Sequence, residues 1–467
     1  MSEIKFACNK TPWHRQSYDR FLQERLPQLL LERGFPLVGY QVQPTNSHAC
    51  RVTLHLGSEK GDFAVAYDSL PLPDEEGVFW LKDEAWVVVP VASGPELEKA
   101  RVDCAGELLE AYLSPRIGQA PSDLPWEEGL VRAWLPLDAW VADFLSENAQ
   151  RLDTTNGYSR VTHLRRMVLR ERGPVVMPGQ RGRVCPFEMP EGPNIGMVFT
   201  IACGAKVEDG RLVIVDHSPA AGLGMTASMI PFLEHSDPNR LLMGASMMRQ
   251  WLPTSEQEPP LVQTGRELGG EGFWIGRNLL TAFVSWGAGT YSDGIVISQS
   301  CAQRLNYPYP AEAGDKLSNR YGTKGVVGVV LPDEQMPHLA DGTPVELVYN
   351  FASLHMRMNF GQLLEAMISR VAKKGGQPVI VPPYGAPPVE EIRRRLQQAG
   401  LPQSGMERLR MGKDGPALDR ESLVGWVYWG RTAHLAKGKM KTWLEEGGQQ
   451  QLGEMEANAL VDAGAKE

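Results

Sequence analysis

The chain has 467 residues, of which 42% are hydrophobic and 22% are charged. At about 150 residues per domain this length predicts about three domains, and the composition excludes a disordered, collagen-like or coiled-coil chain. No apolar run approaches the roughly 20 residues of a membrane span, and the first ten residues lack the apolar segment of a signal peptide. Six cysteines without a CxxC pair exclude a zinc ribbon and a disulfide framework, and they favour a reducing cytoplasm.

The net charge of −9 disfavours a nucleic-acid binder, but the charge is unevenly distributed. Residues 1–150 carry 13 basic and 23 acidic side chains, a balance of −10, whereas the other 317 residues balance to +1. Within residues 151–200 there are eight arginines and four acidic side chains. A partner that bears phosphate groups could therefore meet a locally positive surface there.

Hydrophobic periodicity and turn residues predict a mixture of helices and short strands. The predicted helices cover residues 14–34, 95–112, 137–148, 359–373 and 388–400. Strand-like segments with turn formers between them fill residues 48–92, and a further strand is predicted at 425–430. The Pro/Gly-rich, acidic stretch near residue 120 is the best candidate for a linker.

Taken singly, the segments that carry chemistry leave the function open. Residues 313–330 place Lys316, Arg320 and Lys324 among glycines, which is typical of a phosphate-binding loop and also of a hairpin with solvated lysines. Residues 181–196 combine Arg181 and Arg183 with prolines and glycines, which favours a rigid loop or a plain Pro-rich connection.

Read in order, five long segments resemble the β subunit of the multisubunit DNA-directed RNA polymerases. They are GRVCPFEMPEGPNIG (182–196), PFLEHSDPNRLLMGASMMRQ (231–250), NLLTAFVSWGAGTYSDGIVIS (278–298), GDKLSNRYGTKGVV (314–327) and DGTPVELVYN…RMNFGQLLE (341–365). The last follows the family pattern DGTPVDIVLN…RMNIGQxxE, and the fourth follows GDKxxxRHGxKGVV. Weaker echoes include NGYSRVTHLRR (156–166), GWVYWGRTAHLAKGKM (425–440) and GEMEANAL (453–460).

The resemblance implies an α+β, β-rich fold with a double-psi β-barrel core. It implies three regions, which are a divergent N-terminal remnant of the protrusion (1–125), a catalytic-side core with a fork-like segment and the barrel (126–385), and a C-terminal hybrid-binding or anchor-like segment (386–467). Only 15 residues separate Ser298 from Gly314, where the family inserts its flap, and most of the lobe is absent. Contact with a sigma factor through a flap is therefore not expected.

The resemblance also implies roles for individual residues. Lys316 and Lys324 would be catalytic contacts of the RNA 3′ end and the incoming nucleotide. Substrate-binding roles would fall to Arg183 and Arg357 on the triphosphate, and to Asp293, near the second magnesium ion, and His434. The expected nucleic-acid contacts are Arg165, Arg166, Arg181, Asn194 and Arg320.

Two departures and one absence limit what the chain can do alone. Ser292 stands where the family has Glu, and Tyr321 replaces the His of RHG. The family's metal-binding aspartates belong to an NADFDGD motif of the β′ subunit, and no DxDGD occurs here. The expected cofactor is therefore Mg²⁺, held mainly by a β′-like partner. A DNA template, an RNA transcript and NTPs are the further expected partners. The expected location is the cytoplasm, at the nucleoid and away from any membrane.

Three hypotheses follow. The first is a minimal β-type subunit of a reduced RNA polymerase that transfers nucleotides together with a β′-like chain. The second is a catalytically inactive β-like protein that binds polymerase subunits or nucleic acid as a regulator. The third is a nucleic-acid-binding module outside a polymerase.

Overall fold

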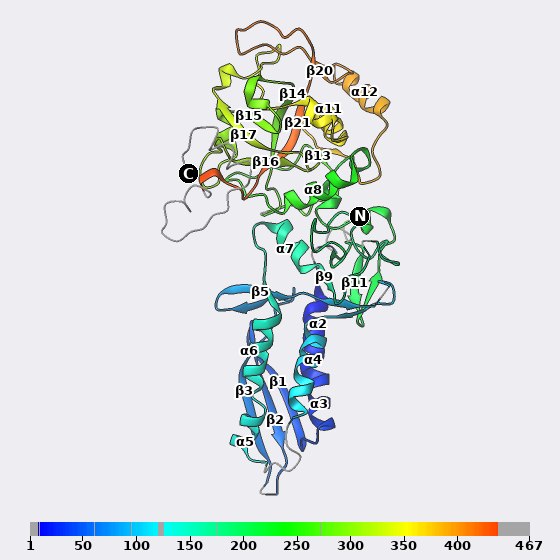
Figure 1. Cartoon of the computed structure of the whole chain (residues 1–467), viewed down its shortest axis with the longest axis vertical. Helices are drawn as coiled ribbons and strands as arrows, with labels where there is room; N and C mark the ends of the chain where they lie inside the picture. Colours follow the sequence, from blue (N-terminus) through cyan, green and yellow to red (C-terminus); the bar gives the residue numbers. More distant parts are fainter. Residues whose placement is uncertain are drawn as a thin grey trace.

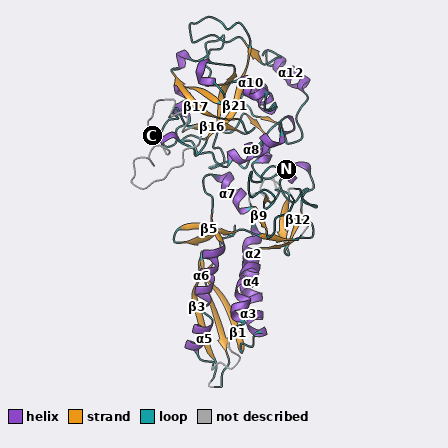
Figure 2. Cartoon of the chain, viewed as in Figure 1, coloured by secondary structure: helices purple, strands orange, loops and turns teal. Residues whose placement is uncertain are grey.

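The chain folds into an elongated molecule with a β-barrel at one end and a unit of helices and strands at the other (Figure 1). The computed structural model describes residue 8 and residues 10–59, 61–94, 96–119, 126–174, 176–270 and 272–437. Helices and many short strands occur along the whole of this part (Figure 2), so the predicted α+β, β-rich class is confirmed. None of the described helices is long and apolar enough to cross a bilayer.

The N-terminal unit packs helices on one antiparallel sheet. Its sheet has the order β1-β2-β3 and its strands are β1 (Leu37–Asn46), β2 (Ala49–Leu56) and β3 (Phe63–Pro71). Its helical segments are α2 (Pro12–Arg20), the π-helical turn η1 (Phe21–Arg25), α3 (Leu26–Glu32), α4 (Ala105–Ile117), α5 (Glu128–Trp134) and α6 (Leu137–Asn148). One hydrophobic cluster joins them and runs from Tyr18 to Leu145. The three-region division of the chain stays a prediction.

The middle of the molecule consists of small sheets around one short helix. The strands are β4 (Phe79–Leu81), β5 (Glu84–Val88), β6 (Val91–Ser93), β7 (Arg101–Asp103), β8 (Ala149–Arg151), β9 (Arg166–Leu169), β10 (Val198–Thr200), β11 (Ala205–Glu208) and β12 (Arg211–Ile214), and the helix is α7 (Gly157–Leu164). They form sheets of order β4-β5-β8, β10-β9-β6-β7 and β11-β12. Strand β7 occupies part of the helix that the sequence predicted at 95–112, so that helix begins only at Ala105.

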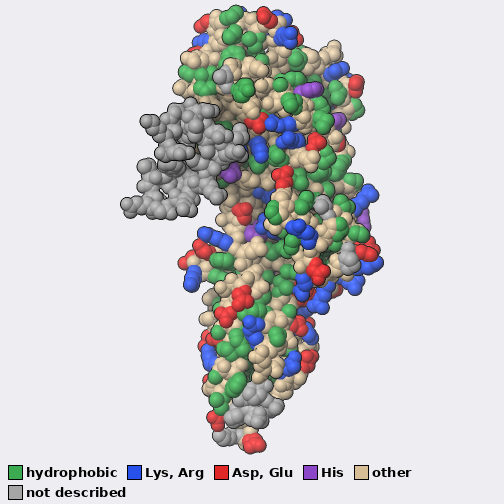
Figure 3. All heavy atoms as spheres, in the orientation of Figure 1, with side chains coloured by type: hydrophobic (Ala, Val, Ile, Leu, Met, Phe, Trp, Pro, Cys, Tyr) green, Lys and Arg blue, Asp and Glu red, His purple; other side chains and the backbone are tan. Residues whose placement is uncertain are grey.

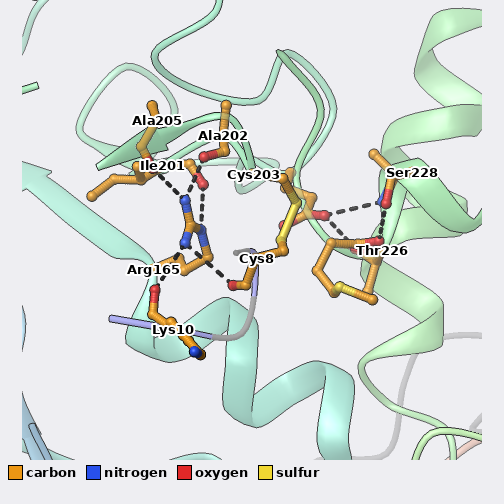
Figure 4. The surroundings of a disulfide bond; sticks show 12 residues. Cys8, Lys10, Arg165, Ile201, Ala202, Cys203, Ala205, Thr226 and Ser228 are labelled. Carbon is orange, nitrogen blue, oxygen red and sulfur yellow. Dashed lines mark hydrogen bonds between the residues drawn. A yellow bond between two sulfur atoms is a disulfide. The ribbon is translucent and has the colours of Figure 1, made fainter. Parts of the chain in front are cut away.

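A disulfide joins Cys8 to Cys203 across 195 residues (Figure 4). It ties the N-terminal segment to the loop before β11, beside the buried guanidinium of Arg165. The sequence did not predict this bond, because neither cysteine has a partner at a recognisable spacing. The other described cysteines, Cys50, Cys104, Cys185 and Cys301, are buried thiols.

The far end of the molecule is a closed six-stranded barrel. Its strands are β14 (Arg277–Phe283), β15 (Gly294–Ser298), β16 (Lys316–Asn319), β17 (Lys324–Leu331), β18 (Leu347–Tyr349) and β21 (Ser422–Arg431). They pair in the order β14-β18-β15-β17-β16-β21, and β21 pairs back onto β14 from Phe283↔Leu423 to Arg277↔Trp429, which closes the ring. Short β20 (Met406–Glu407) adds to the outer edge of β21.

Helices and two hydrophobic clusters hold the barrel together. Helix α11 (Gly361–Gly375) packs along β21, and Gly425 permits this approach, since a Cβ there would lie 1.8 Å from the Ala366 carbonyl oxygen. Alternate strand residues enter different clusters, as Ile295 and Val296 do, because the strand pleat points them to opposite faces. The remaining helices and strands are α8 (Pro238–Met248), β13 (Val262–Gln263), α9 (Gln299–Arg304), α10 (Phe351–His355), β19 (Val379–Ile380) and α12 (Val389–Gln398).

Two buried histidines should make the stability of the fold depend on pH. His14 contacts the Leu164 carbonyl oxygen at 2.8 Å, and His163 accepts a hydrogen bond from the Asp153 amide. Burial is the main cause that lowers the pKa of each to about 4, so the folded chain keeps them neutral where the unfolded chain, near pKa 6.5, protonates them. The stability that they contribute is complete above pH 6.5 and is lost as the pH falls toward 4.

We expect each histidine to lower the free energy of unfolding by about 2 kcal/mol between pH 7.5 and pH 5. Urea denaturation at the two pH values measures this difference. A His163→Gln variant should show a smaller difference than the unsubstituted chain. An equal difference in both proteins would contradict the contribution of His163.

Candidate active site

The two predicted catalytic lysines lie on one face of neighbouring barrel strands. Lys316 begins β16 and Lys324 begins β17. In the antiparallel register Ser318 is opposite Lys324. Lys316 is therefore the diagonal neighbour of Lys324, and the two Cα atoms lie about 7–8 Å apart. Leu317 points to the other face, into the hydrophobic cluster. Both lysines are half-buried, and among the described residues no acidic group forms an ion pair with Lys324.

Asp293 lies at the same edge of the barrel, where β15 begins. Val326 pairs with Lys316 on one side and with Gly294 on the other, so Asp293 and Lys316 flank β17 at about two strand spacings, roughly 10 Å. The Val326 amide donates to the Asp293 carbonyl oxygen at 3.2 Å. A Cβ on Gly325 would lie 2.1 Å from that oxygen, so the close approach of the two segments needs glycine at this position.

Arg357, in the segment that follows β18, forms an ion pair with Asp293. Its Nη2 lies 2.6 Å from Asp293 Oδ1, and its Nη1 donates to the Tyr349 hydroxyl at 2.7 Å. Helix α10 is fixed above this pair, because Ser353 Oγ donates to the Ser292 carbonyl oxygen at 2.9 Å. Burial is the main cause that raises the pKa of Tyr349 to about 12, so its hydroxyl keeps its proton at neutral pH.

His434 also lies beside this edge. Its carbonyl oxygen accepts from the Lys316 amide at 3.3 Å, and its side chain is exposed. The segment is anchored by the fully buried Asp315–Arg431 ion pair, at 2.6 Å. The barrel therefore brings Lys316, Lys324, Asp293, Arg357 and His434 to one edge.

Arg183 belongs to a different part of the molecule. Its Nε donates to the Leu212 carbonyl oxygen at 3.3 Å and its Nη1 to that of Gly179 at 3.2 Å, and no described hydrogen bond or ion pair joins it to the barrel. Arg181 and Asn194 are exposed in the same loop region, and Arg166 is half-buried at the start of β9. Figure 3 shows Lys and Arg side chains at the level of β11, with acidic ones among them. The predicted roles of these four residues stay predictions.

Two of the predicted nucleic-acid contacts are buried arginines. Arg165 is 1% exposed and donates to the carbonyl oxygens of Cys8, Ile201, Ala202 and Ala205 (Figure 4). Arg320 is 2% exposed and forms an ion pair with Glu365 at 2.5 Å, with further bonds to the carbonyl oxygens of Met229 and Val262. Neither guanidinium reaches the surface, and both join separate segments of the fold. The predicted contact of the two residues with nucleic acid stays a prediction.

The two departures from the family pattern have different surroundings. Ser292 adopts the left-handed region at φ 53° and turns the chain into Asp293. Tyr321 is fully buried, and Asn359 Nδ2 donates to its carbonyl oxygen at 2.6 Å. Tyr321 is therefore part of a hydrophobic cluster with Met229 and Trp251, and its side chain does not reach the surface.

The described residues could supply only part of a Mg²⁺ site. They contain no group of three or more His, Cys, Asp or Glu side chains that could hold a metal ion. Asp293, whose side chain is 42% exposed, is the carboxylate at the candidate site. Since Mg²⁺ needs several converging oxygen ligands, the described residues alone do not complete a Mg²⁺ site.

A groove lined by described residues lies beside the candidate site. It has a volume of about 960 Å³, and apolar residues of α11 and of the segment around Arg357, such as Phe351 and Met358, line it. None of the predicted site residues lines this groove. The charged groups that the barrel gathers at one edge therefore lie outside this groove.

Comparison with known proteins finds two stretches of the chain that match family models. Residues 308–452 match the family model described as RNA polymerase Rpb2, domain 6, and residues 150–207 match RNA polymerase Rpb2, domain 3. Over these residues the chain is similar to the RNA polymerase β subunit. The barrel in its domain 6 region is the predicted double-psi barrel.

Curated β subunits match this chain over limited lengths. The "DNA-directed RNA polymerase subunit beta" of Chlorobium luteolum is 40% identical over 169 residues, which cover 33% of this chain and 13% of the relative. That of Salinibacter ruber is 36% identical over 169 residues, with the same two coverages. That of Treponema denticola is 22% identical over 633 residues, covering 71% of this chain and 54% of the relative.

Sequence reasoning missed three features of the described structure. They are the Tyr349 hydroxyl between Arg357 and Asp293, the buried Asp315–Arg431 pair, and the disulfide. The sequence held one indication of the Tyr349 hydroxyl, because the family pattern DGTPVDIVLN has Leu at that position. The other two depend on segments that meet only in the folded chain.

Proposed function

We propose that this chain positions the RNA 3′ end and the incoming NTP for template-directed nucleotidyl transfer, as one subunit of a DNA-directed RNA polymerase. Its partner would be a β′-like chain that carries the metal-binding aspartates. The observation that supports this function is the gathering of Lys316, Lys324, Arg357 and Asp293 at one edge of the barrel.

Transfer of a nucleotidyl group needs neutralisation of phosphate charge and accurate positioning. The ammonium groups of Lys316 and Lys324 act as point charges for phosphate oxygens, and the fork of Arg357 suits a triphosphate. Asp293 contributes one carboxylate near the nucleotide. Mg²⁺, held mainly by the partner, would supply further charge neutralisation.

The same proposal covers location and the rest of the molecule. A subunit that acts on template DNA works in the cytoplasm, at the nucleoid. The region 1–125 would be a remnant of the protrusion and 386–467 a hybrid-binding or anchor-like segment, around the core at 126–385. The disulfide is uncommon in that compartment.

Purification of the chain with its partners from its own cells tests the function. The complex should contain a chain with an NADFDGD motif and should extend an RNA primer on a DNA template only when Mg²⁺ is present. The isolated chain should not extend the primer, because the residues that the structure describes supply too few metal ligands.

The alternative is a catalytically inactive β-like regulator. The loss of a carboxylate at Ser292 favours this reading, because it weakens the support for a second metal ion. A complex that assembles with polymerase subunits and binds nucleic acid, but extends no primer, would contradict the proposed activity and support the regulator.

A further inference from the structure

Tyr349 connects the two charged members of the candidate site. Its hydroxyl accepts from Arg357 Nη1 at 2.7 Å and donates to Asp293 Oδ1 at 3.4 Å. Arg357 Nη2 lies 2.6 Å from Asp293 Oδ1 and 2.8 Å from Oδ2. The three side chains therefore form a closed set of contacts in which tyrosine and carboxylate hold different nitrogens of one guanidinium.

The ring of Tyr349 is fixed by packing that does not need the hydroxyl. Its side chain ends β18, is fully buried, and lies 6.2 Å from the Trp429 ring, centroid to centroid. The resembling pattern has Leu at this position, so an apolar side chain suffices for the barrel. The hydroxyl is an additional polar atom on a rigid support, and it points at Arg357.

A phosphate group would compete with Asp293 and leave the contact with Tyr349 intact. Arg357 and Asp293 are partly exposed, at 25% and 42% of their side chains, so a ligand can approach their pair. A phosphate oxygen that takes Nη2 replaces one anionic acceptor by another. Nη1 keeps its bond to Tyr349, and the guanidinium stays in its orientation while the carboxylate is released.

Resting on the proposed function, we propose that Tyr349 is a positioning residue, which keeps Arg357 directed at the phosphates of the incoming nucleotide when they displace Asp293. The hydroxyl acts through Arg357 and need not touch the reacting atoms. The freed Asp293 carboxylate then becomes available to the divalent cation that accompanies a nucleotide.

Single-nucleotide addition by the purified complex tests this role with a Tyr349→Phe variant, which keeps the ring and removes one oxygen. We expect KM for ATP at saturating Mg²⁺ to rise about tenfold, the size of one hydrogen bond to a charged group, with kcat within about twofold. Inhibition by inorganic tripolyphosphate, which presents phosphates alone, should weaken by a similar factor.

Tyr428→Phe is the matched control. Its hydroxyl is also in the barrel, where it donates to the Glu258 carbonyl oxygen at 3.0 Å and accepts from the Gly276 amide at 3.0 Å. Loss of this oxygen removes two hydrogen bonds without touching Arg357. We expect KM for ATP to stay within about twofold of the unsubstituted complex.

A double-mutant cycle separates positioning from general stability. If Tyr349 acts through Arg357, Tyr349→Phe should have no further effect on KM in an Arg357→Gln background. An unchanged KM in the single variant, or additive effects in the cycle, would overturn the inference while the unsubstituted complex remains active. A complex that never extends a primer would overturn the proposed function itself.

Discussion

Replacement of Lys324 or Lys316 by alanine is expected to slow primer extension by the assembled complex by about 100-fold or more. Each lysine presents a positive charge at the barrel edge, beside the start of β15 and Asp293. A fixed positive charge stabilises the negative charge that develops in the transition state better than water does. Its removal therefore raises the barrier of the chemical step. The rate of single-nucleotide addition at saturating NTP measures the effect.

Lys206→Ala provides a matched control for the two lysine variants. Lys206 lies on β11 and pairs with Glu208 at the surface, 2.7 Å apart, so its loss removes the same charge far from the barrel strands in sequence. We expect all three variants to assemble with their partners, and only Lys206→Ala to extend at the unsubstituted rate. Extension at that rate by both Lys316→Ala and Lys324→Ala would refute their assigned roles.

Replacement of Asp315 by alanine is expected to lower the free energy of unfolding by about 3–5 kcal/mol. Asp315 and Arg431 are both 0% exposed and lie 2.6 Å apart. Arg431 also donates to the carbonyl oxygens of Leu305, Tyr307 and Tyr309, so the guanidinium cannot turn outward. Removal of the carboxylate leaves a buried positive charge without a counter-charge.

Urea denaturation measures this loss, with Asp68→Ala as the control. Asp68 pairs with Arg51 at 2.5 Å, and both side chains are about half exposed, at 59% and 49%. Surface pairs of this kind contribute at most about 1 kcal/mol. A free energy of unfolding within about 1 kcal/mol of the unsubstituted chain for Asp315→Ala would contradict a structural role for this pair.

The local parts of the fold could be predicted from the sequence. The helix expected at 137–148 is α6 (Leu137–Asn148), because its apolar residues recur at helical spacing and pack on one side. Closure of the barrel could not be predicted from local patterns. It depends on β21, which pairs with β14 across more than 140 residues, and only the resemblance to a known family indicated it.

In the candidate site, too, some features could be predicted from the sequence and others depend on segments that are distant in the chain. The resemblance indicated Lys316, Lys324, Asp293 and Arg357, and the strand register explains why residues from separate segments meet. Burial of Arg165 could not be predicted, because its acceptors come from residues near Cys8 and from 201–205. In the sequence a buried arginine of this kind is indistinguishable from one that binds phosphate.

Photo-crosslinking of the transcript end tests the central claim most directly. An RNA with 4-thiouridine as its 3′-terminal nucleotide would be bound to the complex on a DNA template, irradiated, and the linked peptides of this chain identified. The account predicts links within residues 314–327, the segment that carries both lysines. Links confined to residues 150–207, or to partner chains alone, would contradict it.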